Sequence, residues 1–258
     1  YTAAIMTSKL GLNFWLTLPA AGVMAGLIGG LLGLVSLRVR NDFLAVTTIG
    51  VNFVAVAIFQ YTPYLGASYG MAVTKPMSNF AFLGLVVVLI MLTCLLCRLI
   101  QDSWLGLALG GVRNNEEAAA SIGIDVNKFK VIAFVIGTAI AGVTGAVYAH
   151  YMTFIYSSDF AFITSISILS MVVVGGMGTI RGAFVGAIIL GLIPEAFRFI
   201  SDYRMLLYGG LLVLMMRFQS EGLLGEGSFL WSRLTLLAEP IKLSRMRGEP
   251  GRVKHHGE

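Results

Sequence analysis

The sequence has few charged residues. Asp, Glu, Lys and Arg make up 12% of its 258 residues, and hydrophobic residues make up 57%, whereas an average soluble domain carries roughly 25% charged residues. The mean hydropathy is +0.85. Since so few charges exclude an ordinary soluble domain, the composition predicts a polytopic membrane protein built from apolar helices.

Signatures of catalysis and of nucleotide binding are missing as well. The sequence contains no GxxxxGK[ST] motif and no Gly-Lys dipeptide, so it offers no P-loop for a nucleotide phosphate. The two cysteines, Cys94 and Cys97, lie in an apolar run without nearby partners, and we interpret them as small core or lipid-facing residues rather than a redox or metal site. Neither a nucleophile with its base nor a metal cluster is apparent, so we expect no enzyme, no catalytic residue, no metal and no cofactor.

Charge of either sign avoids the middle of the apolar runs. Asp42, Asp102 and Asp159 lie at or beyond the ends of these runs, whereas an ion-coupled carrier or a channel would need such residues deep in a span. The net charge of +5 and the pI near 9.3 arise from basic residues beside apolar segments and in the C-terminal tail. Positive-inside topology explains that placement better than nucleic-acid binding does, so the bilayer is the expected surrounding.

Hydrophobic runs predict about seven membrane segments, which cover residues 16–37, 42–61, 80–99, 131–151, 163–177, 183–197 and 205–216. The runs 163–177 and 183–197 are short and flank a glycine-rich turn, so they form either two short spans or a re-entrant pair. The predicted fold is therefore an all-α transmembrane helical bundle. Residues 1–217 form the membrane domain, with a polar loop at 101–130, and residues 218–258 form a basic tail.

The basic residues predict the orientation. Of the 18 Lys and Arg residues, only Lys9, Lys75, Arg198 and Arg204 fall on one side of this topology. The remainder lie on the side of the polar loop and the tail, and an excess of this kind marks the cytoplasmic side. The loop and the tail are therefore predicted to be cytoplasmic.

Small residues recur every four positions in two of the spans. Such spacing places them on one helix face, where a second backbone can approach closely. The sequence therefore predicts helix packing at two stripes, which are Gly22, Gly26 and Gly30, and Gly137, Ala141 and Gly145.

Polar side chains within spans suggest a substrate pathway. The candidates are Thr47, Thr48, Asn52, Ser167 and Ser170. A polar group within a span is costly unless it faces a partner or water. Hydrogen bonding between helices, or from Ser and Thr back to their own helix carbonyls, is the alternative interpretation.

The polar stretch 113–130, RNNEEAAASIGIDVNKFK, predicts a short helix outside the membrane. Asn114 and Glu117 have the spacing of a capping box, and Glu116 and Glu117 suit the first turn of a helix. Gly123 is the expected left-handed terminator and Asp125 the cap of the next helix. The helix is expected to present one small apolar face, made of Ala118, Ala119 and Ile122.

Glu117-Ala118-Ala119, followed after three residues by Gly123, resembles the EAA---G loop of ABC-importer permeases, which docks into a cytoplasmic ATPase subunit. Residues 37–50, 113–151 and 168–190 resemble the branched-chain amino-acid permease family, in particular its M-type subunits. Two features depart from the family pattern. The longer loop consensus ends in I-x-L-P, whereas Ile132 here leads into Ala133-Phe134-Val135, and relatives usually carry further apolar segments before the LPAAG-like stretch at Leu18. We therefore expect this sequence to be part of a longer permease.

The resemblance implies one membrane half of an ATP-driven importer in a bacterial-type cytoplasmic (inner) membrane. The implied solute is a branched-chain amino acid, with urea, a short amide or another small polar solute as the alternative and an ion-coupled carrier or channel as the less favoured one. Implied partners are a second, homologous permease subunit, two ATP-binding subunits and an extracytoplasmic solute-binding protein. The implied ATPase-coupling residues are Glu116, Glu117, Ala118, Ala119, Ile122 and Gly123.

Overall fold

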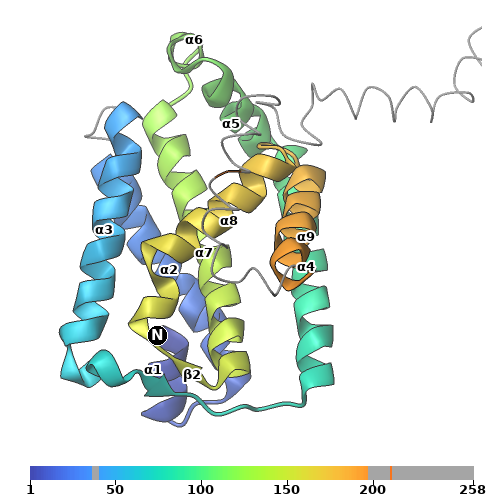
Figure 1. Cartoon of the computed structure of the whole chain (residues 1–258). Helices are drawn as coiled ribbons and strands as arrows, with labels where there is room; N and C mark the ends of the chain where they lie inside the picture. The colour runs from blue at the N-terminus through green and yellow to red at the C-terminus, as the bar shows by residue number, and fades with distance from the viewer. Residues whose placement is uncertain (37–40, 197–209, 211–258) are drawn as a thin grey trace, which may run out of the picture. The chain divides into compact units, whose positions relative to one another are not determined.

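The computed structural model describes residues 1–36, 41–196 and 210, and Figure 1 shows the arrangement of its helices. The chain divides into two compact units, Tyr1–Thr164 and Ser165–Glu258. Among the described residues, four helices are long and apolar enough to cross a membrane, or five if the bent pair Val46–Tyr61 and Pro63–Tyr69 counts as one span. The helical, multi-pass architecture is confirmed. The described residues support four or five spans rather than about seven, and the predicted segment 205–216 and tail 218–258 lie outside them.

The first unit is mostly helical. Its α-helices are α1 (Thr2–Ser8), α2 (Phe14–Ser36), α3 (Asn41–Tyr61), α4 (Asn79–Gln101), α5 (Trp104–Asn114), α6 (Glu116–Ser121) and α7 (Val126–Met152). Short 3₁₀ turns are η1 (Pro63–Leu65), η2 (Ala67–Tyr69) and η3 (Ser157–Phe160). The strands β1 (Met71–Ala72) and β2 (Phe154–Ile155) pair antiparallel, with Met71 opposite Ile155. The predicted spans agree with α2, α3, α4 and α7 to within a few residues, whereas α5 and the β1–β2 ribbon were not predicted.

The α2–α7 pair forms the centre of the first unit, and glycine makes its close packing feasible. A Cβ atom at Gly22 would lie 2.8 Å from Cγ2 of Val143, and one at Gly142 would lie 2.6 Å from the carbonyl oxygen of Ala21. Gly26 and Gly30 face Ala139 and Val135 of α7. Small residues allow this approach, because any side chain would separate the two backbones.

The second predicted stripe lies on another face of α7. Ala141 is exposed, and a Cβ atom at Gly137 or Gly145 would meet no atom within 4 Å among the described residues. Helix α2 instead contacts the face that carries Thr138 and Gly142. Spacing identifies which residues share a face, but the face that meets a neighbour depends on the rotation of the helix. This stripe is therefore not the face that meets α2, and its packing against another helix stays a prediction.

The two ends of the first unit are built differently. Helix α1 and the β1–β2 ribbon lie at one end, and α5 and α6 lie at the other (Figure 1). His150, fully buried on α7, ties α1 to this bundle: its Nε2 lies 3.0 Å from Oγ1 of Thr7, and its Nδ1 lies 2.8 Å from the carbonyl oxygen of Ala146. Since a carbonyl oxygen can only accept a hydrogen bond, Nδ1 of His150 donates to Ala146.

Helix α8 (Phe162–Gly175) begins in the last residues of the first unit. The rest of α8, from Ser165, belongs to the second unit together with α9 (Ile180–Ala196). Backbones approach so closely there that a Cβ atom at Gly175 would collide with the carbonyl of Gly182, and one at Gly186 with the carbonyl of Met171. The two helices correspond to the predicted pair of short apolar runs. Whether that pair is re-entrant stays a prediction.

Candidate functional site

The first candidate site is the polar end of the first unit, where α5 supports α6. Ser103 caps α5, since its Oγ accepts from the amide of Gly106 at 3.5 Å and donates to the carbonyl of Ile100 at 2.7 Å. A Cβ atom at position 106 would collide with that carbonyl. Glycine therefore lets α5 turn closely past the end of α4. The apolar residues of α5 recur at helical spacing, which is the signal that could have predicted this helix. They are Leu105, Ala108, Leu109 and Val112.

Helix α6 begins one residue later than predicted. The side chain of Asn115, not that of Asn114, accepts a hydrogen bond from the amide of Ala118 at 3.0 Å. Asn114 is the last residue of α5. The predicted Asn114 cap is therefore wrong, because α5 continues through that residue and leaves only Asn115 extended at the junction.

Gly123 ends α6 in the predicted left-handed conformation, with φ of +86°. The amide of Ile124 donates to the carbonyl oxygen of Ala119 at 3.1 Å, and the amide of Gly123 donates to the carbonyl oxygen of Ala120 at 3.0 Å. This pair of bonds is a Schellman motif, which satisfies carbonyls at a helix end. Asp125 then caps α7 as predicted, by accepting from the amide of Lys128 at 3.1 Å.

The exposed face of α6 differs from the predicted one at Ala119. That side chain is only 3% exposed, because it packs with Ala108, Val112 and Phe129 in a cluster between α5, α6 and α7. Ile122, by contrast, is 77% exposed. The prediction that Ala119 shares an outer face with Ala118 and Ile122 is therefore wrong. We call four of the exposed residues here the α6 surface, namely Glu117, Ala118, Ser121 and Ile122.

An ion pair holds α6 on α7. Nζ of Lys130 lies 2.7 Å from Oε2 of Glu116, with both side chains partly exposed. A pair of this kind contributes only about 0.2–1 kcal/mol because solvent screens it, but it adds to the buried cluster beneath Ala119 and to the Schellman turn. Of the two glutamates in the first turn of α6, Glu116 is engaged with α7, and Glu117 lies on the exposed surface.

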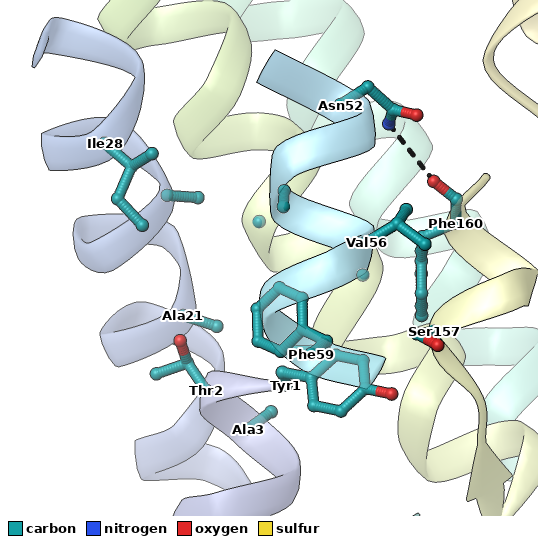
Figure 2. Close-up of a pocket in the computed structure, with 15 residues that line it drawn as sticks. Tyr1, Thr2, Ala3, Ala21, Ile28, Asn52, Val56, Phe59, Ser157 and Phe160 are labelled. Carbon is teal, nitrogen blue, oxygen red and sulfur yellow. Dashed lines mark hydrogen bonds between the residues drawn. The ribbon is translucent and has the colours of Figure 1, made fainter. Parts of the chain in front are cut away.

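The second candidate site is a cavity of about 260 Å³ in the first unit, toward the end that carries α1. Figure 2 shows its lining: Ile28 and Ala21 lie on α2, Val56 and Phe59 lie on α3, and the ring of Tyr1 lies against that of Phe59. The two rings stack with centroids 4.2 Å apart. The remaining lining is mostly small or apolar and consists of Thr2, Ala3, Ala25, Asn52, Ala55, Gly142, Gly145, Ala146, Ser157 and Phe160.

Two polar atoms at this cavity are buried and have no hydrogen-bond partner among the described residues, namely Oδ1 of Asn52 and the hydroxyl of Tyr1. Nδ2 of Asn52 donates to the carbonyl of Phe160 at 3.2 Å, which fixes the amide (Figure 2). Burial, and secondly the Asp159 carboxylate, raise the pKa of the Tyr1 phenol, so this group stays protonated as a donor.

The structure gives the other predicted pathway residues different surroundings. Thr47 and Thr48 lie on α3 before Asn52 and do not line the cavity. In the second unit, Ser167 is half-buried, and Ser170 is 1% exposed. Oγ of Ser170 donates to the carbonyl of Ile166 at 2.8 Å, four residues back in the same helix. Ser170 therefore satisfies its own hydroxyl as a helix-packing residue does, and a pathway that joins it to Asn52 stays a prediction.

Sequence reasoning missed most of the cavity wall. It selected Asn52 because an amide in an apolar span stands out, whereas Tyr1, Phe59 and Phe160 are aromatic residues of the kind found at any membrane boundary. Their common feature is proximity, with Tyr1 and Phe160 ring centroids 6.2 Å apart. No local pattern carries that information.

Comparison with known proteins places the chain in a family. Residues 1–216 match the family described as branched-chain amino acid transport system / permease component. The chain is 34% identical to the high-affinity branched-chain amino acid transport system permease protein LivM of Escherichia coli, over 87% of this chain and 60% of that protein.

Two further relatives extend the similarity. The chain is 27% identical to the probable branched-chain amino acid transport permease protein LivH of Methanocaldococcus jannaschii, over 74% of this chain and 65% of that protein. It is 32% identical to the permease protein BraD of Pseudomonas aeruginosa, over 49% of this chain and 42% of that protein. No solved structure matches the chain.

The chain spans about 60% of the length of the LivM relative. With its apolar helices and this family match over most of its length, the chain belongs to the permease components of branched-chain amino acid transport systems.

Proposed function

We propose that this chain is the membrane-spanning part of a permease subunit in an ATP-driven importer of branched-chain amino acids. The observation that carries the proposal is the α6 surface. A six-residue helix stands at one end of the first unit, fixed by a Schellman turn, a buried alanine and an ion pair, with Ile122 directed outward. A short helix held so firmly, with an exposed apolar side chain at its end, suits docking to a partner better than it suits a mere connection.

The family relationship supports the choice of partners. Relatives of this chain are named LivM and LivH, which are permease proteins of branched-chain amino acid transport systems. The proposed complex pairs this subunit with a second permease subunit and contains two ATP-binding subunits, one of which binds the α6 surface. An extracytoplasmic solute-binding protein delivers the amino acid at the opposite end.

The distribution of charge supports the orientation. Lys9 and Lys75 lie near the end with α1 and the β1–β2 ribbon, where Nζ of Lys9 sits 3.2 Å from the ring centroid of Tyr64. More basic residues lie at the other end, toward α5 and α6, namely Arg98, Arg113, Lys128 and Lys130. Aromatic side chains gather at membrane boundaries, and basic residues concentrate on the cytoplasmic side. We therefore place α6 in the cytoplasm and the β1–β2 ribbon at the outer face of the inner membrane.

The transport activity is tested by uptake. Full-length protein, assembled with its partner subunits in proteoliposomes, is expected to import radiolabelled leucine only when ATP is present on the side of α6. Urea supplied at the same concentration is expected to remain outside. Uptake that needs an ion gradient instead of ATP, or that favours urea over leucine, would contradict the proposal.

Cysteine labelling tests the orientation. In a background without Cys94 and Cys97, an impermeant maleimide added to intact cells is expected to label Ser158→Cys and not Asn127→Cys. Both native residues are exposed, so accessibility differs only by the side of the membrane. In permeabilised cells, both cysteine variants should react with the maleimide. Labelling of Asn127→Cys alone in intact cells would reverse the proposed topology.

A further inference from the structure

The cavity in the first unit has the size and lining of a site for a small, partly apolar solute. Its volume of about 260 Å³ is close to the lower end of the roughly 300–1,000 Å³ range of small-molecule sites. Among the described residues, no charged side chain lines it. A solute with a net charge would lose its hydration there without compensation, so the lining favours one that is neutral overall.

The polar atoms at this cavity indicate what such a solute must offer. Because Nδ2 of Asn52 is already bonded to Phe160, the amide cannot turn over without breaking that bond. Its buried Oδ1 lacks a partner among the described residues, and a carbonyl oxygen can only accept a hydrogen bond. Leaving such an atom unpaired is costly. A ligand with an N–H group could donate the hydrogen bond that Oδ1 lacks.

We propose that this cavity binds an aliphatic α-amino acid during its passage, with the side chain against the apolar wall and the amino group on Oδ1 of Asn52. The wall that would receive the side chain includes Ala21, Ile28 and Val56 (Figure 2). The hydroxyl of Tyr1, which is also unpaired, is a donor for the carboxylate. The inference rests on the proposed function and assigns a binding site to it.

Gly145 determines how much room the side chain has. It lines the cavity, and a Cβ atom built there would meet no atom within 4 Å among the described residues. A larger residue at this position therefore fills the site without displacing the surrounding helices. Gly142 also lines the cavity, but a Cβ atom there would lie 2.6 Å from the carbonyl oxygen of Ala21, so its replacement would disturb α2 as well.

The test compares uptake of leucine and alanine by full-length Gly145→Ala and Gly145→Val complexes. Added carbons reduce the space for a large side chain first, and one methylene is worth about 10- to 200-fold in discrimination. The leucine-to-alanine uptake ratio is expected to fall roughly tenfold or more in Gly145→Val and by less in Gly145→Ala. Selectivity of the solute-binding protein is the same in every variant, so it cancels when each ratio is divided by that of the wild type.

Gly137→Val is the matched control. It lies on the same helix, a Cβ atom there also meets no atom within 4 Å, and it does not line the cavity. Its leucine-to-alanine ratio is expected to equal that of the wild type. Because the ratio is taken within one variant, a general loss of assembly does not alter it.

Asn52→Leu tests the polar contact separately. Loss of the acceptor is expected to raise the KM for both amino acids by about tenfold or more, since the amino group is charged, with little change in their ratio. If wild-type complexes import leucine but Gly145→Val keeps the wild-type ratio, or if Asn52→Leu keeps the wild-type KM, the site assignment is wrong and the proposed function stands. Wild-type complexes that import neither amino acid would overturn both.

Discussion

Replacing Ile122 by Glu is expected to abolish ATP-driven uptake while the chain still folds and inserts normally. Ile122 is 77% exposed at the end of α6, so the charged side chain has room in water and costs the isolated subunit little. In the proposed complex, the same side chain would be buried against the ATPase. Truncating a hot-spot residue of an interface costs about 2 kcal/mol or more, and burying an unpaired charge adds to that cost. We take Ile122 as such a residue and expect binding of the ATPase to weaken by about 100-fold.

The measurement is co-purification of the ATPase with the permease, together with leucine uptake. Asn127→Glu is the control, because Asn127 is also exposed and lies in the first turn of α7, outside the α6 surface. The Asn127→Glu variant should still co-purify with the ATPase and still import leucine. Ala119→Glu is not informative, since Ala119 is buried beneath α6 and a glutamate there would disrupt the cluster whatever its role. Normal uptake by Ile122→Glu would show that α6 only connects α5 to α7.

The α6 region shows where sequence reasoning succeeds and where it stops. The left-handed turn at Gly123 and the Asp125 cap follow from local chemistry, and both could be predicted. The choice between Asn114 and Asn115 as the cap depends on where α5 ends, and α5 itself was missed. The burial of Ala119 depends on Ala108 and Phe129, which lie on the neighbouring helices α5 and α7. No pattern within α6 itself distinguishes Ala119 from Ala118.

The cavity gives the same lesson on a larger scale. Asn52 was recognisable because an amide is unusual in an apolar span. Its neighbours come from five separate elements, α1, α2, α3, α7 and η3. The contact that orients the amide, from Asn52 to Phe160, joins residues 108 positions apart. A sequence can therefore nominate a polar residue in a membrane span, whereas the shape of the space around it depends on how the helices pack.

The largest effect on folding is expected at Gly142. Replacing it by Leu would force side-chain atoms into the α2–α7 contact, where even a Cβ atom would lie 2.5 Å from Cβ of Ala25 and 2.6 Å from the backbone of Ala21. Backbone atoms cannot move aside as a flexible side chain does. Overpacking of this kind costs about 1–3 kcal/mol for modest additions, so Gly142→Ala should lower the free energy of unfolding by that amount and Gly142→Leu should abolish accumulation of folded protein.

A series of Gly→Ala variants measured for unfolding in detergent tests the cause of this effect. At Gly137 a Cβ atom meets nothing within 4 Å, at Gly26 it lies 3.4 Å from Cβ of Ala139, and at Gly142 it collides with α2. The expected order of stability is therefore Gly137→Ala, then Gly26→Ala, then Gly142→Ala, with Gly137→Ala stabilising by about 0.5–1 kcal/mol through helix propensity. Periodicity alone predicts a different order, because Gly26 and Gly137 belong to the two regular stripes and Gly142 belongs to neither. If Gly137→Ala proves as damaging as Gly142→Ala, the α2–α7 packing described here is not the contact that stabilises the bundle.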